Sequence, residues 1–220
     1  MILYGPSMSP FVRKVLAFAA EKGIELENRP LNLGSDDPGF LAASPFRKFP
    51  ALEDGDFRLA DSSAIVHYLE AKHPDPALIP AEPRERARTI WWDEFADTLL
   101  FACGGKLFFN RVVAPRFLGR PGDPEIARKA EAEELPPLLD YLEANAPAPD
   151  GFLVGDRVTL SDLAVASPFA NLRHAGVTWD RERHPRLAAW VETILARPSF
   201  ETWVGREARL LDRMVASAAS

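Results

Sequence analysis

Residues 44–69, SPFRKFPALEDGDFRLADSSAIVHYL, constrain the fold of this chain more than any other stretch. A short apolar run is followed by the acidic glycine turn EDGD and by a second short run, FRLA. Asp61, Ser62 and Ser63 then open a segment whose apolar residues have helical spacing. This order predicts a strand, a tight turn, a second strand and a helix.

Two positions within this stretch constrain it further. Pro50 has no N–H to donate, so it suits the first residue of a strand, and its position alone favours an ordinary trans bond. Asp61 and Ser62 lie where a helix has unpaired N–H groups and the positive end of its dipole. The sequence therefore predicts that a carboxylate can be held beside Asp61 and Ser62.

The residues before this stretch alternate between strand and helix patterns. Met1-Ile2-Leu3-Tyr4 predicts a short buried strand, and an apolar helical stripe follows over residues 11–23. Residues 24–31 alternate loosely as a second strand, and residues 34–43 predict a short, irregular helix. A strand–helix–strand unit pairs its strands in parallel, whereas the later hairpin adds antiparallel strands, so the predicted sheet is mixed.

The composition changes after Leu69. A Pro-rich linker of about ten residues leads into a region in which nearly every pattern is helical. Within it, Thr159 and Asp162 predict a helix start in which Asp162 reaches back to the cap. We therefore predict an α/β domain over residues 1–80 and an all-helical domain over residues 82–220.

Charge and cysteine content exclude several functional classes. The formal charge of −6 argues against nucleic acid as a partner. No run of about 18 apolar residues predicts a transmembrane helix, and the N-terminus lacks a signal-peptide pattern. Cys103 is the only cysteine and the histidines have no ligand spacing, so we expect no disulfide, no metal and a reducing, cytoplasmic location.

The loop between the first strand and the first helix is where we expect the chemistry. Pro10 suits the first helical turn, which makes Ser9 the natural N-cap. Ser9 either caps the helix only, or its hydroxyl also donates a hydrogen bond to a thiolate bound at the helix N-terminus. A free thiol has a pKa of about 8.5, and a hydroxyl donor together with the helix dipole would favour the anion.

At this point the chain resembles the cytosolic glutathione transferase family, and in particular its serine-type, bacterial-like members. The resemblance covers essentially the whole chain. It is carried in order by the LYG-x-x-x-SPF-x-RKV start, RKFPAL, ADSSAI and TLSDLA. It implies a thioredoxin-like first domain that binds glutathione and a helical second domain that lines the pocket of the second substrate.

The resemblance also implies a role for each residue on the thiol side of the site. Ser9 falls at the serine that stabilises the glutathione thiolate. Pro50 falls at a cis-proline, and the backbone of Phe49 before it would pair with the cysteinyl part of glutathione. Tyr4, which lies near the tyrosine of tyrosine-type members, and Ser7 remain open as alternatives to Ser9.

Other residues fall at positions that hold the two ends of glutathione. Asp61 and Ser62 match the acidic-Ser pair that holds the γ-glutamyl group, and Lys48 matches a basic position that can reach the glycine carboxylate. Many family members have Glu or Gln where this chain has Asp61, so the γ-glutamyl contact would be made by a shorter side chain. Asp162 matches a structural capping residue.

The sequence therefore predicts an enzyme that conjugates glutathione to a small hydrophobic electrophile. Met8, Phe11, Phe101 and Phe108 are the expected residues of the electrophile pocket. The alternatives are a glutathione-dependent isomerase and a non-catalytic binding or regulatory protein of the same fold.

A homodimer is expected from the same resemblance. The helix predicted from residue 84 to residue 100 supports it with apolar residues on more than one face. Asp93 and Asp97 on this helix could reach the γ-glutamyl ammonium of the neighbouring subunit, but solvated carboxylates are the simpler interpretation.

Overall fold

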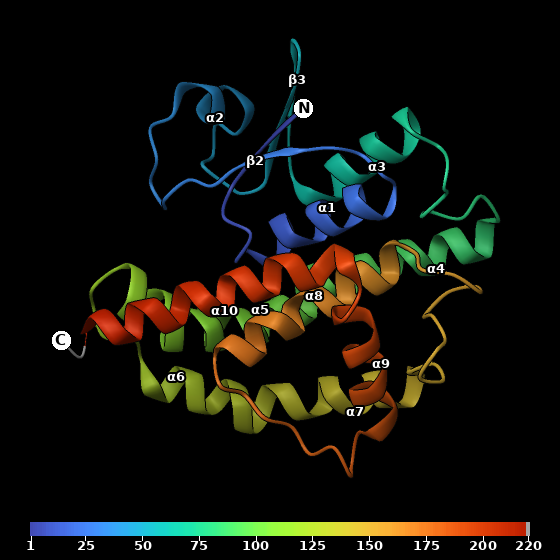
Figure 1. Cartoon of the computed structure of the whole chain (residues 1–220). Coiled ribbons are helices and arrows are strands. Elements are labelled where there is room, and N and C mark those ends of the chain that lie inside the picture. Colours follow the sequence, from blue (N-terminus) through green and yellow to red (C-terminus); the bar gives the residue numbers. More distant parts are fainter. Residues whose placement is uncertain (219–220) are drawn as a thin grey trace.

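The structure, a computed structural model, describes residues 1–218, with side chains as far as Ala216, and has a sheet-containing part and a helical part (Figure 1). The elements of the first part are β1 (Ile2–Tyr4), α1 (Pro10–Glu21), β2 (Glu27–Arg29), α2 (Pro38–Ala43), β3 (Ala51–Asp54), β4 (Phe57–Ala60) and α3 (Ser62–Lys72).

A mixed sheet forms the centre of the first part. Its strand order is β2-β1-β3-β4, with β1 parallel to β2 and antiparallel to β3, and β3 and β4 form the predicted hairpin. Gly55 occupies the left-handed φ of +64° that the hairpin turn requires. The order of elements and the mixed pairing are as predicted, because the helix α1 between β1 and β2 forces a parallel crossover.

Two elements are shorter than the sequence patterns indicated. The second strand spans only β2, and α2 begins at Pro38 instead of near residue 34. Asp37 caps α2, since its Oδ1 accepts a hydrogen bond from the Phe40 backbone N–H at 2.9 Å. The start signal Asp37-Pro38 was therefore present in the sequence, where a polar cap followed by proline marks a helix N-terminus.

The second part is entirely helical. Its elements are α4 (Pro83–Glu94), η1 (Phe95–Leu100), α5 (Phe101–Phe108), η2 (Phe109–Phe117), α6 (Pro124–Lys129), η3 (Ala130–Glu134), α7 (Leu135–Asn145), α8 (Leu160–His174), α9 (Pro185–Leu195) and α10 (Pro198–Ala218), where η marks π-helical segments. None of the helices among the described residues is long and apolar enough to cross a membrane.

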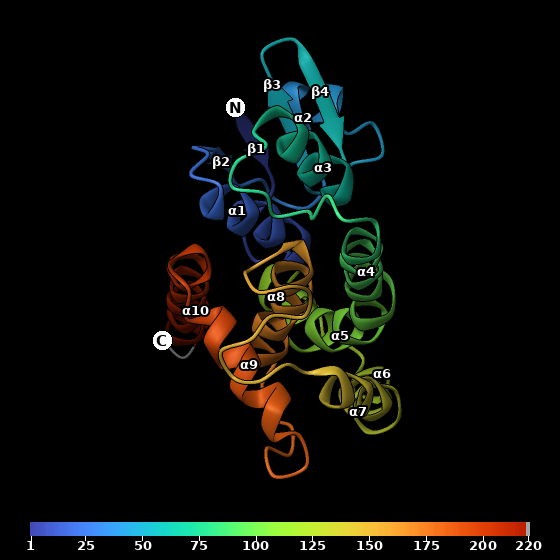
Figure 2. The same ribbon diagram turned by 90° about the vertical axis from the view of Figure 1, so that its right-hand side faces the viewer.

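Helix α8 is the central element of the helical part (Figure 2). It packs against α1, α4, α5 and α9, and its residues from Leu160 to Leu172 are buried. Asp162 accepts hydrogen bonds from the backbone N–H groups of Thr159 at 2.9 Å and Leu153 at 2.8 Å, so the predicted cap is confirmed. Burial raises the pKa of Asp162 to about 6.

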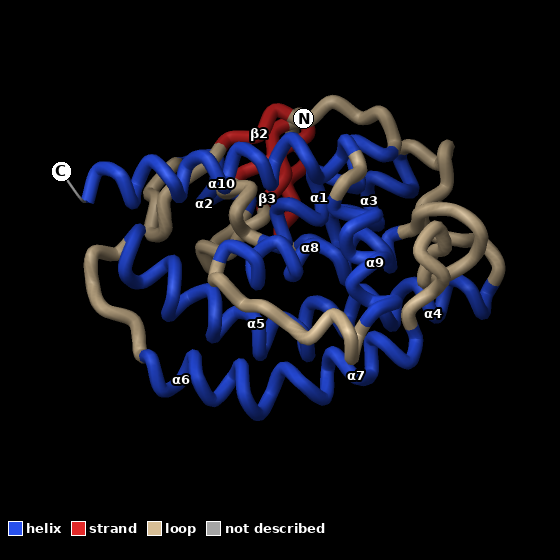
Figure 3. The backbone as a smooth tube through the Cα atoms, turned by 60° about the horizontal axis from the view of Figure 1, so that its bottom comes forward, coloured by secondary structure: helices blue, strands red, loops and turns tan. Residues whose placement is uncertain are grey.

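Helix α1 joins the two parts. It packs against α3 on the sheet side and against α8 and α10 on the helical side. Figure 3 shows α10 running along the edge of the molecule beside α1 and β2. The loop between β1 and α1 is consequently enclosed by the sheet, α8 and α10.

Candidate active site

The loop between β1 and α1 brings Ser9 to the N-terminus of a 12-residue helix. Ser9 is the N-cap residue, and its backbone N–H donates to the Pro6 carbonyl at 3.0 Å. Among the described residues, however, its side chain makes no capping hydrogen bond. Ser9 therefore occupies the predicted N-cap position without a side-chain cap, and the residue is half-buried.

Gly5 brings the β1–α1 loop against Phe49. A Cβ at Gly5 would lie 2.7 Å from Val12 Cγ2 and 3.1 Å from Phe49 Cβ, and the φ of +130° is also unfavourable for any other residue. Glycine at this position is what allows the backbone before Ser9 to approach the residue that precedes Pro50. The two segments expected to hold the thiol are therefore neighbours.

The bond between Phe49 and Pro50 is cis, as the resemblance implied. The Phe49 ring stacks on Phe40 of α2 with 4.6 Å between the ring centroids. Ser44 closes the preceding turn, because its hydroxyl donates to the Lys48 carbonyl at 2.8 Å and accepts from the Lys48 N–H at 2.9 Å. The Lys48 side chain is exposed beside this turn.

Tyr4, one of the two alternatives to Ser9, is buried and already has a partner. Its hydroxyl donates to Glu53 Oε2 at 3.0 Å, and the side chain is only 1% exposed. Burial, followed by the hydrogen bond to Glu53, raises the pKa of Tyr4. Ser7, the other alternative, is half-buried and lines a hollow beside α10.

Asp61 and Ser62 lie at the start of α3, as predicted. Asp61 is the N-cap, with its Oδ1 accepting from the backbone N–H groups of Ser63 at 2.9 Å and Ala64 at 3.1 Å. Ser62 is 3% exposed, and its hydroxyl donates to Asp97 Oδ2 at 3.2 Å. The hydroxyl of Ser62 therefore turns toward the helical part in this structure, and its backbone N–H is the remaining donor for a carboxylate.

A buried ion cluster lies directly beneath this helix start. Lys14 of α1 is 1% exposed, and its Nζ lies 2.7 Å from Asp93 Oδ1 and 2.6 Å from Asp97 Oδ2. Ser63 donates to Asp93 Oδ2 at 2.7 Å. Burial raises the pKa of Asp97, an effect that the charge of Lys14 opposes and the charge of Asp93 reinforces.

This cluster corrects the interpretation of Asp93 and Asp97 as solvated carboxylates. Asp93 is 1% exposed, and both residues are bound to Lys14 of their own chain. Sequence reasoning missed Lys14 altogether. The available signal was a lysine inside an otherwise apolar helical stripe, where a charge must find a buried partner.

A second buried cluster fixes the other side of the β1–α1 loop. Arg13 is 0% exposed, and its Nη2 and Nε lie 2.7 Å and 3.2 Å from the carboxylate of Glu207 on α10. Asn171 of α8 donates to the Met8 carbonyl at 2.8 Å and accepts from Arg13 Nη1 at 2.8 Å. These contacts tie the residue before Ser9 to both α8 and α10.

The expected electrophile-pocket residues are only partly gathered. Met8 lines a hollow of about 610 Å³ between the β1–α1 loop, β2 and α10. Phe11 and Phe101 contact each other, with 4.5 Å between their ring centroids. Phe108 packs against the hydrophobic core. Within the described part of the chain, no group of three or more His, Cys, Asp or Glu residues could hold a metal ion.

A sheet domain, whose β1–α1 loop lies beside a cis-proline turn, is joined to a helical domain, which is the two-domain arrangement of a glutathione transferase. Family comparisons agree: residues 3–77 match the glutathione S-transferase N-terminal domain, and residues 99–198 match the C-terminal domain. The chain belongs to the glutathione S-transferase family.

Individual relatives match over nearly the whole chain. A glutathione S-transferase of Hyoscyamus muticus is 33% identical over 91% of this chain and 95% of its own length, and glutathione S-transferase 3 of Zea mays is 35% identical over 92% of each. A theta class glutathione S-transferase of Xanthomonas axonopodis pv. citri, solved with glutathione bound, is 29% identical. It covers 92% of this chain and 96% of its own, with a TM-score of 0.77. Neither the isomerase nor the non-catalytic alternative is favoured by these relatives.

Proposed function

We propose that this glutathione transferase activates the thiol of glutathione at Ser9 and transfers the thiolate to a hydrophobic electrophile. The thiol proton is released, sulfur forms a bond to the electrophilic carbon, and with an aryl halide the halide leaves. The observation that carries the proposal is the Ser9 side chain, which occupies an N-cap position without capping its helix among the described residues. Its hydroxyl can therefore donate to a sulfur anion.

The choice of Ser9 over its two alternatives rests on position and bonding. The Tyr4 hydroxyl is engaged by Glu53, and its raised pKa makes it a weaker donor. Ser7 faces the hollow beside α10, whereas Ser9 adjoins the first turn of α1, where the helix dipole also favours an anion. Both the hydroxyl and the dipole would lower the pKa of a thiol bound at Ser9.

The remaining contacts to glutathione come from two segments. The Phe49 backbone beside cis-Pro50 would pair with the cysteinyl part, and exposed Lys48 would approach the glycine carboxylate. Asp61 and the backbone N–H of Ser62 would hold the γ-glutamyl group, because the start of α3 offers an acceptor for the ammonium and a donor for the carboxylate. Charge complementarity at both ends would orient the thiol toward Ser9.

The proposed roles of these residues also divide the chain into two domains. We propose residues 1–80 as the glutathione-binding domain and residues 82–220 as the domain that lines the electrophile pocket. Met8, Phe11, Phe101 and Phe108 are the proposed apolar residues of that pocket. Detoxification of hydrophobic electrophiles in the cytoplasm is the corresponding role, with neither nucleic acid nor a membrane as partner.

We also propose that the protein is a homodimer. Several large apolar side chains remain on the surface of this chain, and Phe46 is 87% exposed. On α4 and η1, Trp91 is 45% exposed and Leu99 is 53% exposed, although neighbouring Trp92 and Phe95 are buried. An apolar surface of this kind is typical of an interface, and a two-fold pair is the commonest arrangement.

Steady-state conjugation of 1-chloro-2,4-dinitrobenzene tests the proposed reaction. We expect saturable turnover in which one glutathione is consumed for each chloride released. Thiol titration at the end of the reaction separates this outcome from isomerisation, which would leave the amount of glutathione unchanged. No turnover despite tight glutathione binding would contradict the proposed transfer and favour a binding protein.

A further inference from the structure

The hollow beside the β1–α1 loop has a cationic wall. Helix α10 contributes Arg206, Arg209 and Arg213 to it, and Leu210 lies between them. Their spacing of three and four residues places these side chains on one face of the helix. The whole chain has a formal charge of −6, so this wall, with three arginines, has the opposite sign of charge to the chain as a whole.

The hollow also has apolar lining residues and borders the β1–α1 loop, which leads to Ser9. Met8 of the β1–α1 loop and Phe117 at the end of η2 line the hollow together with Trp203 of α10. The guanidinium carbon of Arg206 lies 5.1 Å from the centroid of the Trp203 ring. The hollow thus combines a surface for an aromatic or alkyl body with cations for an anionic end.

Among the described residues, the one acidic residue in the lining is Glu207, and it is already paired. Glu207 is 2% exposed, and Arg13 donates hydrogen bonds to both of its carboxylate oxygens. His174 Nε2 also lies 3.0 Å from Glu207 Oε2. Burial raises the pKa of Glu207, but the charge of Arg13 and the hydrogen bond from His174 outweigh this, and the net shift is downward. Glu207 therefore remains an anion that Arg13 neutralises, and it also anchors the arginine face of α10.

The sheet order explains how one thiol site can serve two ligands. Strand β1 lies between β2 and β3, so the loop that follows it borders both neighbours. On the β3 side are Phe49 and the start of α3, which we assign to glutathione. On the β2 side are Asn28, Pro30 and α10, which line the hollow.

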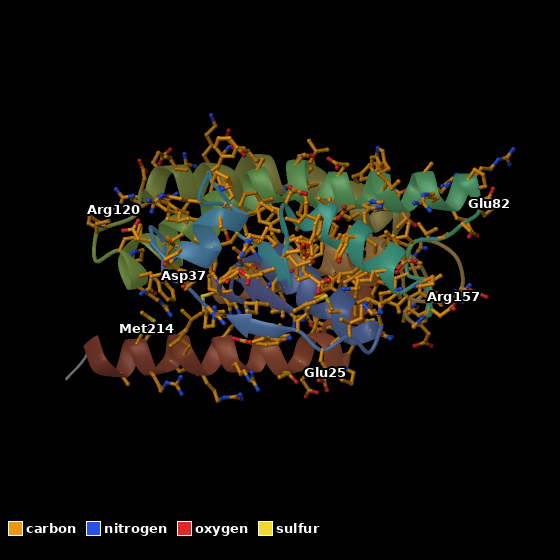
Figure 4. All side chains as sticks on the ribbon, turned by 90° about the horizontal axis from the view of Figure 1, so that it is seen from above. Glu25, Asp37, Glu82, Arg120, Arg157 and Met214 are labelled. Atoms are coloured by element: carbon orange, nitrogen blue, oxygen red, sulfur yellow. The ribbon has the colours of Figure 1, made fainter. Side chains whose placement is uncertain are left out.

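Figure 4 shows Met214, near the C-terminal end of α10, at the opposite end of the molecule from Arg157.

From this arrangement we propose that the preferred electrophiles are apolar molecules that carry a carboxylate, with the carboxylate held by Arg206 and Arg209. The proposal rests on the proposed function, because it assigns the substrate class of the same reaction; of the proposed electrophile-pocket residues, Met8 is the one that lines the hollow. The volume of about 610 Å³ suits a small aromatic acid. Guanidinium groups are well matched to carboxylates, since they can donate two parallel hydrogen bonds.

The test compares 4-chloro-3,5-dinitrobenzoate with 4-chloro-3,5-dinitrobenzamide, each relative to its own uncatalysed rate with glutathione, because the amide also activates the ring more strongly. We expect this relative kcat/KM to be about tenfold higher for the acid, and the preference to fall as salt is added. Arg206→Gln and Arg209→Gln should each reduce the preference about threefold, because exposed ion pairs are individually weak. Arg157→Gln removes the same charge far from the hollow and should leave the preference unchanged.

Equal relative kcat/KM for the acid and the amide in the unmodified enzyme would overturn the proposal while leaving conjugation intact. A preference that survives both α10 substitutions would overturn it as well. Calorimetry with unreactive 3,5-dinitrobenzoate tests the hollow if neither electrophile reacts. If 3,5-dinitrobenzoate binds and Arg209→Gln weakens that binding, the result would support the carboxylate site even though the proposed transfer had failed. If 3,5-dinitrobenzoate does not bind, the carboxylate site is refuted.

Discussion

Asp61 uses one carboxylate oxygen to cap α3 and leaves the other toward solvent. Within the described residues, its hydrogen bonds to the backbone N–H groups of Ser63 and Ala64 are both made by Oδ1. The residue is exposed, so Oδ2 can accept from the ammonium of the γ-glutamyl group without breaking the cap. Capping and ligand binding are therefore separable functions of this side chain.

Two substitutions of Asp61 distinguish these functions. We expect Asp61→Ala to raise the dissociation constant of glutathione about tenfold, since charge-assisted hydrogen bonds contribute about 1.5–3 kcal/mol each. Asp61→Asn retains a capping oxygen but loses the charge, so it should weaken binding with little change in stability. Calorimetry measures the affinity, and equal affinity in all three proteins would show that Asp61 only caps its helix.

Single residues illustrate what the sequence could and could not predict. The positions of Ser9, Pro50 and Asp61 follow from local signals, namely a proline in a first helical turn, a proline before a strand and an acidic helix cap. The orientation of the Ser62 hydroxyl does not follow from local signals, because its acceptor, Asp97, is 35 positions away in sequence. Only the packing of the two parts of the molecule brings Asp97 to the start of α3.

Helix α10 is held in place by a buried charge pair. Arg13 and Glu207 are 0% and 2% exposed and bind each other through two hydrogen bonds. Removing one partner of such a pair leaves an uncompensated buried charge, which costs about 3–5 kcal/mol. Glu207→Gln should therefore lower the free energy of unfolding by about this amount in urea, whereas Glu201→Gln, exposed on the same helix, should have little effect.

The same pair predicts a pH dependence. Because the pKa of Glu207 is lowered on folding, its contribution is present above the ordinary glutamate pKa and is lost as the pH falls through the folded value. The free energy of unfolding should thus decline toward acid pH less steeply in Glu207→Gln than in the unmodified protein. Parallel declines in urea titrations at several pH values would contradict this account of Glu207.

The cap of α8 offers a second test at the scale of an element. Asp162→Ala removes the acceptor for the Thr159 and Leu153 backbone N–H groups, and α8 packs against α1, α4, η1, α5 and α9. Each buried donor left without a partner costs about 1–3 kcal/mol. We expect a clear loss of stability in urea, and no comparable loss in Asp156→Ala, an exposed residue of the preceding loop.

At the scale of the whole molecule, the mixed sheet and the helical second part were predictable. A proline-rich linker marks where strand patterns end, and helical stripes follow it. The buried Lys14 and Arg13 clusters were not predictable, since each joins α1 to residues of the second part. The contacts that position the site therefore depend on how the two parts pack.

The dimer is tested at the same scale. Sedimentation at micromolar concentration should show a species near twice the chain mass of 24.4 kDa. Phe46→Ser should weaken the dimer about tenfold or more, because one buried aromatic can dominate an interface. Phe57→Ser, a partly exposed aromatic of β4, is the matched control. A single species at the chain mass would contradict the proposed pairing.

The central claim, that Ser9 stabilises the glutathione thiolate, is tested most directly by titrating the thiolate absorbance of bound glutathione. In the unmodified enzyme we expect the pKa of the bound thiol to lie below the value of about 8.5 for a free thiol. In Ser9→Ala it should rise by about one unit or more, which corresponds to about 1.4 kcal/mol, with a matching loss of turnover at neutral pH and little change in glutathione affinity. Superimposable titration curves for the two proteins would contradict the account and return Ser7 and Tyr4 to consideration.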